Sequence, residues 1–474
     1  LDELAVGGGA AGLTGVLAVA DEAGGQLDDG AAEGGARLLD EEELAVVGDG
    51  DDAHGAAGVQ ALGVLPGAAS HQADEATRGD GGGLRVIVML VHAESVARGR
   101  AVAVASRSVS RLLSLDALRG VAVILMMTQH LGVWLWQVEE PHRGVIAQAP
   151  VYMAINGLGG LAAPIFITLA GAGTSLMAAR SAAGRGLDGT LLRRGLALMG
   201  FGYLLNWLTP SWFSLGTWFV LHMMGLAIAT APLWRRLGER ALLAAEPVIL
   251  LLTVAVQSFL GTPALLDNPR MRDTSLPGGP LRLALAEGQF PVLPWLALFL
   301  VGMVIGRWLV AEPETAATRV ARLCRVCLLA GLVLVGLDLA AGMVPALRFL
   351  HSAPWWRLVR VRTGFFPAGP GIVLLLQAGV LLLLATALRW ERSRELDPRG
   401  WLVGLGRGSL TLLLVHVVLF REISRPLGAW QAFDRYTSLA IIAGWVVLCA
   451  LLCRIWARSG FRFGAEWLLR RLGG

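Results

Sequence analysis

Three ionisable residues stand in one apolar stretch, LDALRGVAVILMMTQH, at residues 115–130. Asp116 and Arg119 are three positions apart and would share a helix face, and His130 follows eleven residues after Arg119. Ionisable groups inside a membrane are costly and usually serve a function. Arginine suits the binding of an anion, and histidine exchanges protons near neutral pH. The stretch therefore predicts an anion-binding group and a base on one helix. The alternative is that Asp116 is an acid at the start of a helix and Arg119 only sets the membrane topology.

Five of the eight histidines lie in the apolar part of the chain. Under the topology given below, all five lie at mid-membrane or toward the outer side, which favours proton transfer there. The alternative is that each histidine only hydrogen-bonds a neighbouring helix. The five histidines are His130, His142, His222, His351 and His416.

The composition is that of a polytopic membrane protein. The 474 residues are 55% hydrophobic and 16% charged, with a mean hydropathy of +0.61. We expect an all-α fold with about ten transmembrane helices, because each apolar segment is long enough to cross a bilayer. The predicted spans are near residues 116–137, 158–179, 194–212, 215–234, 241–260, 290–310, 322–343, 368–389, 405–424 and 437–457.

The charge distribution divides the chain into two parts. Residues 1–100 carry a net charge of −13, whereas residues 101–474 carry +17. Residues 1–105 are rich in Gly, Ala and acidic residues without a sustained period, so we expect a disordered segment or a wrongly extended gene start. Residues 106–474 are expected to form the helical membrane domain.

Arginine predicts the orientation of this domain. With the start of the first span in the cytoplasm, the cytoplasmic segments hold 24 arginines and the opposite segments hold 11. Both ends of the helical unit should therefore be cytoplasmic. All 40 basic residues are arginine, which indicates a GC-rich coding sequence and hence a bacterial inner membrane.

The four cysteines, Cys324, Cys327, Cys449 and Cys453, all lie in apolar segments. Their spacings place each pair on one helix face, so a metal site between two helices is conceivable. Small buried apolar residues are the favoured interpretation, and no metal is expected.

The stretch SLDALRGVAVILMMTQH resembles the first helix of the acyltransferase-3 family, in which an arginine and a histidine have ten residues between them. Arg119 and His130 have that spacing. The rest of the apolar part is more similar to the heparan-alpha-glucosaminide N-acetyltransferase-like proteins. The similar stretches are APIFITLAGAGTSLM (163–177), LLRRGLALMGFGYLLN (191–206), FPVLPWLALFLVGMVIGR (290–307) and LGRGSLTLLLVH (405–416).

This resemblance implies acetyl transfer from cytoplasmic acetyl-CoA (acyl-CoA), as co-substrate, to an extracytoplasmic sugar amine or hydroxyl. The base would be His130 or His142, because the animal lysosomal enzyme has asparagine at the first position and its histidine about a dozen residues later. His222 and His416 would orient groups or relay protons. The residues expected to bind coenzyme A are Asp116, Arg119, Arg193 and Arg194.

The expected partners are membrane lipid, acyl-CoA and a carbohydrate or glycan acceptor, with a homodimer as a further expectation and no nucleic acid. The competing function is a proton-coupled transporter or lipid flippase, since intramembrane histidines and charges serve proton coupling equally well. A membrane scaffold without chemistry is the third class.

The first prediction concerns topology. Reporter fusions or cysteine labelling at Arg185 and Arg399 should report the cytoplasm, and at Gly278 the outside, because of the arginine asymmetry. A cytoplasmic signal at Gly278 would invert the orientation.

Overall fold

The computed structural model describes residues 112–137, 150–181, 186–351, 365–394 and 396–473. These residues form helices joined by turns, and none of them forms a β-strand; Trp136 and Phe433 pair in one isolated bridge. The expected all-α fold is therefore confirmed. Residues 1–105 and His142 lie outside the described residues, so the predictions for them remain open.

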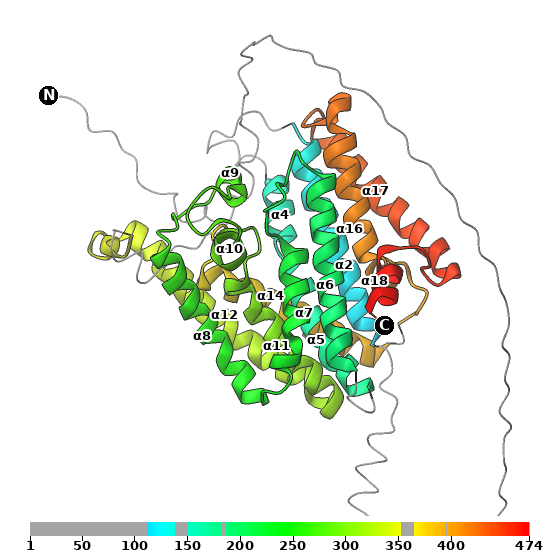
Figure 1. The fold of residues 1–474 in the computed structure, drawn as a ribbon, viewed down its shortest axis with the longest axis horizontal. Coiled ribbons are helices and arrows are strands. Elements are labelled where there is room, and N and C mark those ends of the chain that lie inside the picture. The colour runs from blue at the N-terminus through cyan, green and yellow to red at the C-terminus, as the bar shows by residue number, and fades with distance from the viewer. Residues whose placement is uncertain (1–111, 138–149, 182–185, 352–364, 395, 474) are drawn as a thin grey trace, which may run out of the picture. The chain divides into compact units, whose positions relative to one another are not determined.

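Each of the ten predicted spans coincides with helix in the structure (Figure 1). The longer helices are α2 (Leu113–Leu135), α4 (Pro150–Gly159), α5 (Ala162–Arg180), α6 (Leu187–Leu208), α7 (Val220–Trp234), α8 (Glu239–Phe259), α11 (Val292–Ala311), α12 (Pro313–Met343), α14 (Pro370–Ser393), α15 (Trp401–Arg407), α16 (Ser409–Val417), α17 (Arg435–Trp456) and α18 (Ala465–Gly473). The shorter helices are α9 (Asn268–Arg272), α10 (Gly279–Arg282), η3 (Leu283–Glu287), η4 (Pro345–His351), η5 (Val418–Ile423), η6 (Arg425–Ala429) and η7 (Ala457–Ser459).

Seven helical segments of the described residues are long and apolar enough to cross a membrane, and an eighth qualifies if a bent pair counts as one span. The chain is thus a multi-pass membrane protein. Helices α6 and α7 meet the length and hydropathy requirements less well than expected. Helix α6 carries Asp188, Arg193 and Arg194, and α7 has only 15 residues; the two pack closely against each other.

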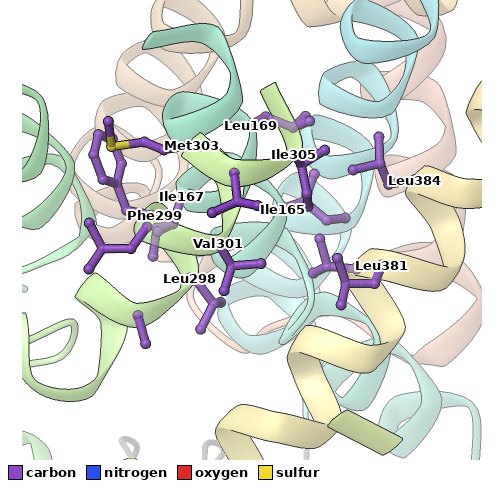
Figure 2. Packing of buried hydrophobic residues seen from close by; sticks show 14 of the residues in the cluster. Ile165, Ile167, Leu169, Leu298, Phe299, Val301, Met303, Ile305, Leu381 and Leu384 are labelled. Atoms are coloured by element: carbon purple, nitrogen blue, oxygen red, sulfur yellow. The ribbon is translucent and has the colours of Figure 1, made fainter. Parts of the chain in front are cut away.

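The core is centred on the pair α5 and α11, with α14 against it (Figure 2). Gly171 of α5 and Gly302 of α11 bring the two backbones together. A Cβ atom at Gly171 would collide with the carbonyl oxygen of Phe299, and one at Gly302 with that of Thr168. Small residues of this kind allow membrane helices to pack closely where no hydrophobic force drives them together.

The bent pair returns the chain to the side of the first helix. Helix α15 and the segment that begins with α16 meet at an angle of 75°, with Gly408 between them. Both α15 and α16 pack against α2. A Cβ at Gly406 would collide with the carbonyl oxygen of Asp116, so only glycine permits this approach. The bend therefore brings residues near 410–420 beside the helix that carries His130.

The second prediction tests the α5–α11 contact. Gly302→Ala should lower the free energy of unfolding by about 1–3 kcal/mol, because the added methyl group has no room between the two backbones. Gly336→Ala is the matched control: Gly336 lies in α12 with no atom within 4 Å of a built Cβ, and the change should be neutral or stabilising. Thermal unfolding in detergent measures both, and equal behaviour of the two variants would refute the close contact.

Candidate functional site

A cavity of about 420 Å³ is lined by both Arg119 and His130. The two residues are eleven positions apart on α2, which corresponds to about 16 Å along the helix axis. We call the ends of this cavity the Asp116 end and the His130 end, after the α2 residues that line them. Most of the remaining lining is apolar and comes from α5, α6, α7 and α16; it includes Phe166, Leu198 and Leu413.

At the His130 end, two histidines form a hydrogen-bonded dyad. Nδ1 of His130 lies 2.9 Å from Nε2 of His416. Nδ1 of His416 lies 2.7 Å from the carbonyl oxygen of Leu412. A carbonyl oxygen only accepts hydrogen bonds, so a neutral His416 carries its proton on Nδ1 and presents a lone pair on Nε2. Nδ1 of His130 must then donate, which leaves Nε2 of His130 unprotonated and able to accept a proton.

Aromatic rings hold the dyad in place. Trp134 stacks on His130 with the ring centroids 5.0 Å apart, and Trp212 meets His130 edge-on at 5.3 Å. His130 also stacks on His416, with 5.2 Å between the centroids. His416 is fully buried, whereas His130 is half-buried and faces the cavity. The dyad is therefore rigid on one side and accessible on the other.

A buried arginine lies behind these tryptophans. The guanidinium of Arg421 is 5.6 Å from the ring centroid of Trp212 and 4.3 Å from that of Trp430. It donates to the hydroxyl and carbonyl oxygens of Ser211, and Ser211 in turn donates to the carboxylate of Glu422. This network fixes the loop that carries Trp212 against the segment that follows α16.

At the Asp116 end, one buried carboxylate holds two arginines. Asp116 is 2% exposed; its Oδ1 lies 2.9 Å from Nη1 of Arg119, and its Oδ2 lies 3.5 Å from Nε of Arg407. Arg407 comes from α15, so this carboxylate ties the bent pair to α2. Arg470 and Glu466 of α18 line the same end of the cavity.

A second cavity, of about 380 Å³, adjoins the first at the Asp116 end. The two cavities share Asp116, Arg119 and three apolar residues of their linings. Arg180 and Arg194 line the second cavity. Five arginines therefore surround the Asp116 end, where they outnumber the two carboxylates of Asp116 and Glu466. Such a surplus of positive charge is suited to phosphate groups.

The structure brings together five of the eight residues selected from the sequence. His130, Asp116 and Arg119 line the larger cavity, His416 completes the dyad, and Arg194 lines the smaller cavity. The other three are not placed there.

Two of these three lie elsewhere in the described structure. Arg193 is exposed on α6 and lines neither of the two cavities. His222 is buried at the start of α7, where its Nδ1 accepts from the backbone N–H of Phe219 and its ring meets Tyr203 edge-on. His142, the third, is outside the described residues.

Several site residues were not selected from the sequence. Arg407 stands inside the stretch LGRGSLTLLLVH that carried the family resemblance, so its position was available as a signal. Arg180, Arg470 and Trp212 gave no such signal, because an arginine or tryptophan at the end of an apolar span is also expected from topology alone. Their place in the site depends on how the helices pack.

The arrangement combines three chemical capacities. It offers an unprotonated imidazole nitrogen at one end, a cluster of arginines at the other, and an apolar passage between them. Such a site can hold an anionic molecule by one end and carry out proton removal at its other end.

The comparisons with known proteins agree with this chemistry. Residues 111–339 match the family model described as heparan-alpha-glucosaminide N-acetyltransferase, catalytic. The match includes Asp116, Arg119 and His130, whereas His416 and Arg407 lie beyond it. No curated protein matches the chain.

The third prediction concerns the shared carboxylate. Asp116→Asn should lower the free energy of unfolding by about 1–3 kcal/mol, because it leaves Arg119 and Arg407 without their buried anion. Asp188→Asn is the control, since Asp188 pairs with Arg235 at the surface, where the shift in unfolding temperature should be smaller. A larger shift for Asp188→Asn in thermal unfolding would contradict the structural role of Asp116.

Proposed function

Because residues 111–339 belong to the heparan-alpha-glucosaminide N-acetyltransferase catalytic family, we propose that this chain transfers an acetyl group from acetyl-CoA to an amine or hydroxyl of a sugar acceptor. The observation that carries the proposal is the single cavity lined by both Arg119 and His130. A helix bundle closed between these residues would leave no path for a donor held at one end to react at the other.

The proposed donor site is the Asp116 end. Coenzyme A carries several phosphate groups, and Arg119, Arg194 and Arg407 supply positive charge around the entrance. Guanidinium groups bind phosphate through charge-assisted, often bidentate, hydrogen bonds. The acyl end of the donor then extends along the apolar passage toward His130.

The proposed base is Nε2 of His130. As the acceptor attacks the carbonyl carbon of the thioester, its N–H or O–H proton passes to this nitrogen. The bond between the carbonyl carbon and sulfur then breaks, and the proton held on Nε2 passes to the thiolate, so that coenzyme A leaves as the thiol and His130 is again unprotonated at Nε2. His416 acts as a positioning residue: its bond to Nδ1 of His130 fixes the tautomer that leaves Nε2 free of a proton.

The proposed direction of transfer is from the cytoplasm outward. The arginine asymmetry favours a cytoplasmic location for the start of α2, and with it for the Asp116 end. Acyl-CoA would enter there, and the acceptor would approach from the His130 end.

The fourth prediction tests the base. His130→Gln should lower the rate of acetyl transfer by about 10²–10⁴-fold, because the glutamine side chain cannot accept the proton. His416→Gln should lower kcat less, since it disturbs only the orientation of His130. Transfer from labelled acetyl-CoA to glucosamine by the purified protein measures both.

His351→Gln is the matched control for this experiment. His351 pairs with Asp338 at 2.7 Å and lines neither of the two cavities, so its replacement should leave the rate unchanged. His142→Gln separates the two candidate bases: a loss larger than that of His130→Gln would make His142 the base. Wild-type turnover in both variants would refute the acyltransferase assignment of this site and favour proton-coupled transport.

A further inference from the structure

The C-terminal helix α18 covers the Asp116 end of the site. It packs against α6 and α16 (Figure 1). Its Gly473 lies against the side chain of Arg194. Glu466, Leu469 and Arg470 line the larger cavity, and Leu469 lines the smaller one as well. A short helix at the end of the chain is thus part of the wall of both cavities.

Glu466 anchors this helix to the start of α16. Its Oε1 accepts from the backbone N–H groups of Leu410 (2.5 Å) and Thr411 (3.0 Å), and its Oε2 accepts from the Thr411 hydroxyl (2.6 Å). The Thr411 hydroxyl oxygen also accepts from the backbone N–H of Ala465 (2.8 Å). The first N–H groups of a helix have no partner within it, and an acidic side chain at that end also complements the helix dipole. Since α16 carries His416, α18 is connected to the dyad through a single helix.

Arg470 lies close to another arginine. It lines the larger cavity, Arg194 lines the smaller one, and Gly473, three residues after Arg470 on α18, lies against the side chain of Arg194. Like charges at short distance repel each other. Among the described residues, no carboxylate forms an ion pair with either Arg194 or Arg470, and Nε of Arg194 is buried without a hydrogen-bond partner. Two neighbouring cations in the walls of adjoining cavities are suited to binding an anion, which would relieve the repulsion.

We propose that α18 is a donor-binding element: Arg470, together with Arg194, binds the phosphates of the adenosine bisphosphate half of coenzyme A, while Glu466 holds the helix over the entrance. This inference rests on the proposed function, because it takes coenzyme A as the anion. It assigns the nucleotide to the Asp116 end; Asp116 is about 21 Å along α2 from His130.

The fifth prediction compares two adjacent arginines of α18. Arg470→Gln should raise the Kd of coenzyme A about tenfold, because one charge-assisted contact to phosphate is lost. Arg471→Gln is the matched control, since Arg471 is exposed on the same helix, lies over the ring of Trp467 and lines neither cavity. The Kd of coenzyme A for Arg471→Gln should stay within about twofold of the unsubstituted value, because Arg471 makes no proposed contact with the phosphates. Isothermal titration of the full-length protein in detergent measures these values.

Adenosine bisphosphate alone serves as the second probe. It should compete with coenzyme A, and Arg470→Gln should weaken its binding by the same factor as that of coenzyme A. Equal affinities for the Arg470→Gln, Arg471→Gln and unsubstituted proteins would overturn the role of α18 and leave the proposed function intact. Equal weakening by both substitutions would also overturn it, because it would indicate a general effect of surface charge. Failure of the unsubstituted protein to bind coenzyme A would overturn both proposals.

Hydrogen exchange distinguishes the loss of a contact between α18 and coenzyme A from a change in the structure of α18 itself. Coenzyme A should slow the exchange of the α18 amides in the unsubstituted protein and in Arg471→Gln, and should slow it less in Arg470→Gln. Unchanged exchange in all three proteins, with coenzyme A bound, would show that α18 does not contact the donor.

Discussion

The hydrogen bond between His130 and His416 is the contact on which the site depends. It joins two residues that are 286 positions apart, and it forms only because the bent pair α15–α16 returns beside α2. In a membrane interior an imidazole without a partner is costly, so each ring satisfies the other. The Leu412 carbonyl oxygen then fixes the direction of both hydrogen bonds. One backbone carbonyl thus decides which nitrogen of His130 is left without a proton.

The bend that makes this contact leaves backbone N–H groups without partners inside the helix, and another part of the chain supplies their acceptors. At Gly408 the helix is interrupted, so α16 starts with backbone N–H groups that α15 does not satisfy. Glu466 accepts from two of them, which requires α18 to fold back over the bundle. On the other side, Gly406 allows α15 to touch the α2 backbone, and Arg407 reaches the buried Asp116. Polar satisfaction, rather than apolar burial alone, therefore determines where α18 lies.

The two ends of the cavity differ in their electrostatics. The Asp116 end has five arginines in its lining, whereas the His130 end is built from aromatic rings and neutral imidazoles. At the His130 end the guanidinium of Arg421 donates to Ser211 and lies over the rings of three tryptophans. This separation allows an anion to be held far from the base, so that binding and proton transfer are carried out by different groups. The lining between the two ends is mostly apolar, and a low local dielectric strengthens electrostatic interactions.

The sequence alone determined the helices and the relation between residues on one helix. Each of the ten segments predicted from hydropathy contains helix, although α4 and α18 were not among them and seven or eight described segments are long and apolar enough to cross a membrane. Eleven residues are close to three turns, so Arg119 and His130 lie on one side of α2. Asp116 and Arg119 pair as their spacing predicts. Periodicity is a property of a single helix, which is why these predictions needed no knowledge of the neighbours.

Only the tertiary structure decided which residues of different helices meet. Apolar membrane helices resemble one another in hydropathy, and their pairing depends on glycine contacts and polar partners that the sequence does not order. His416 therefore contacts His130, and Arg407 pairs with Asp116. His222 and Arg193 lie outside the lining of this cavity. The bend at Gly408 was likewise outside what hydropathy predicts, because a continuous apolar run gives the same signal whether the helix is straight or broken. Most residues selected from the sequence thus lie at the site, but packing between helices decided which partner each of them contacts.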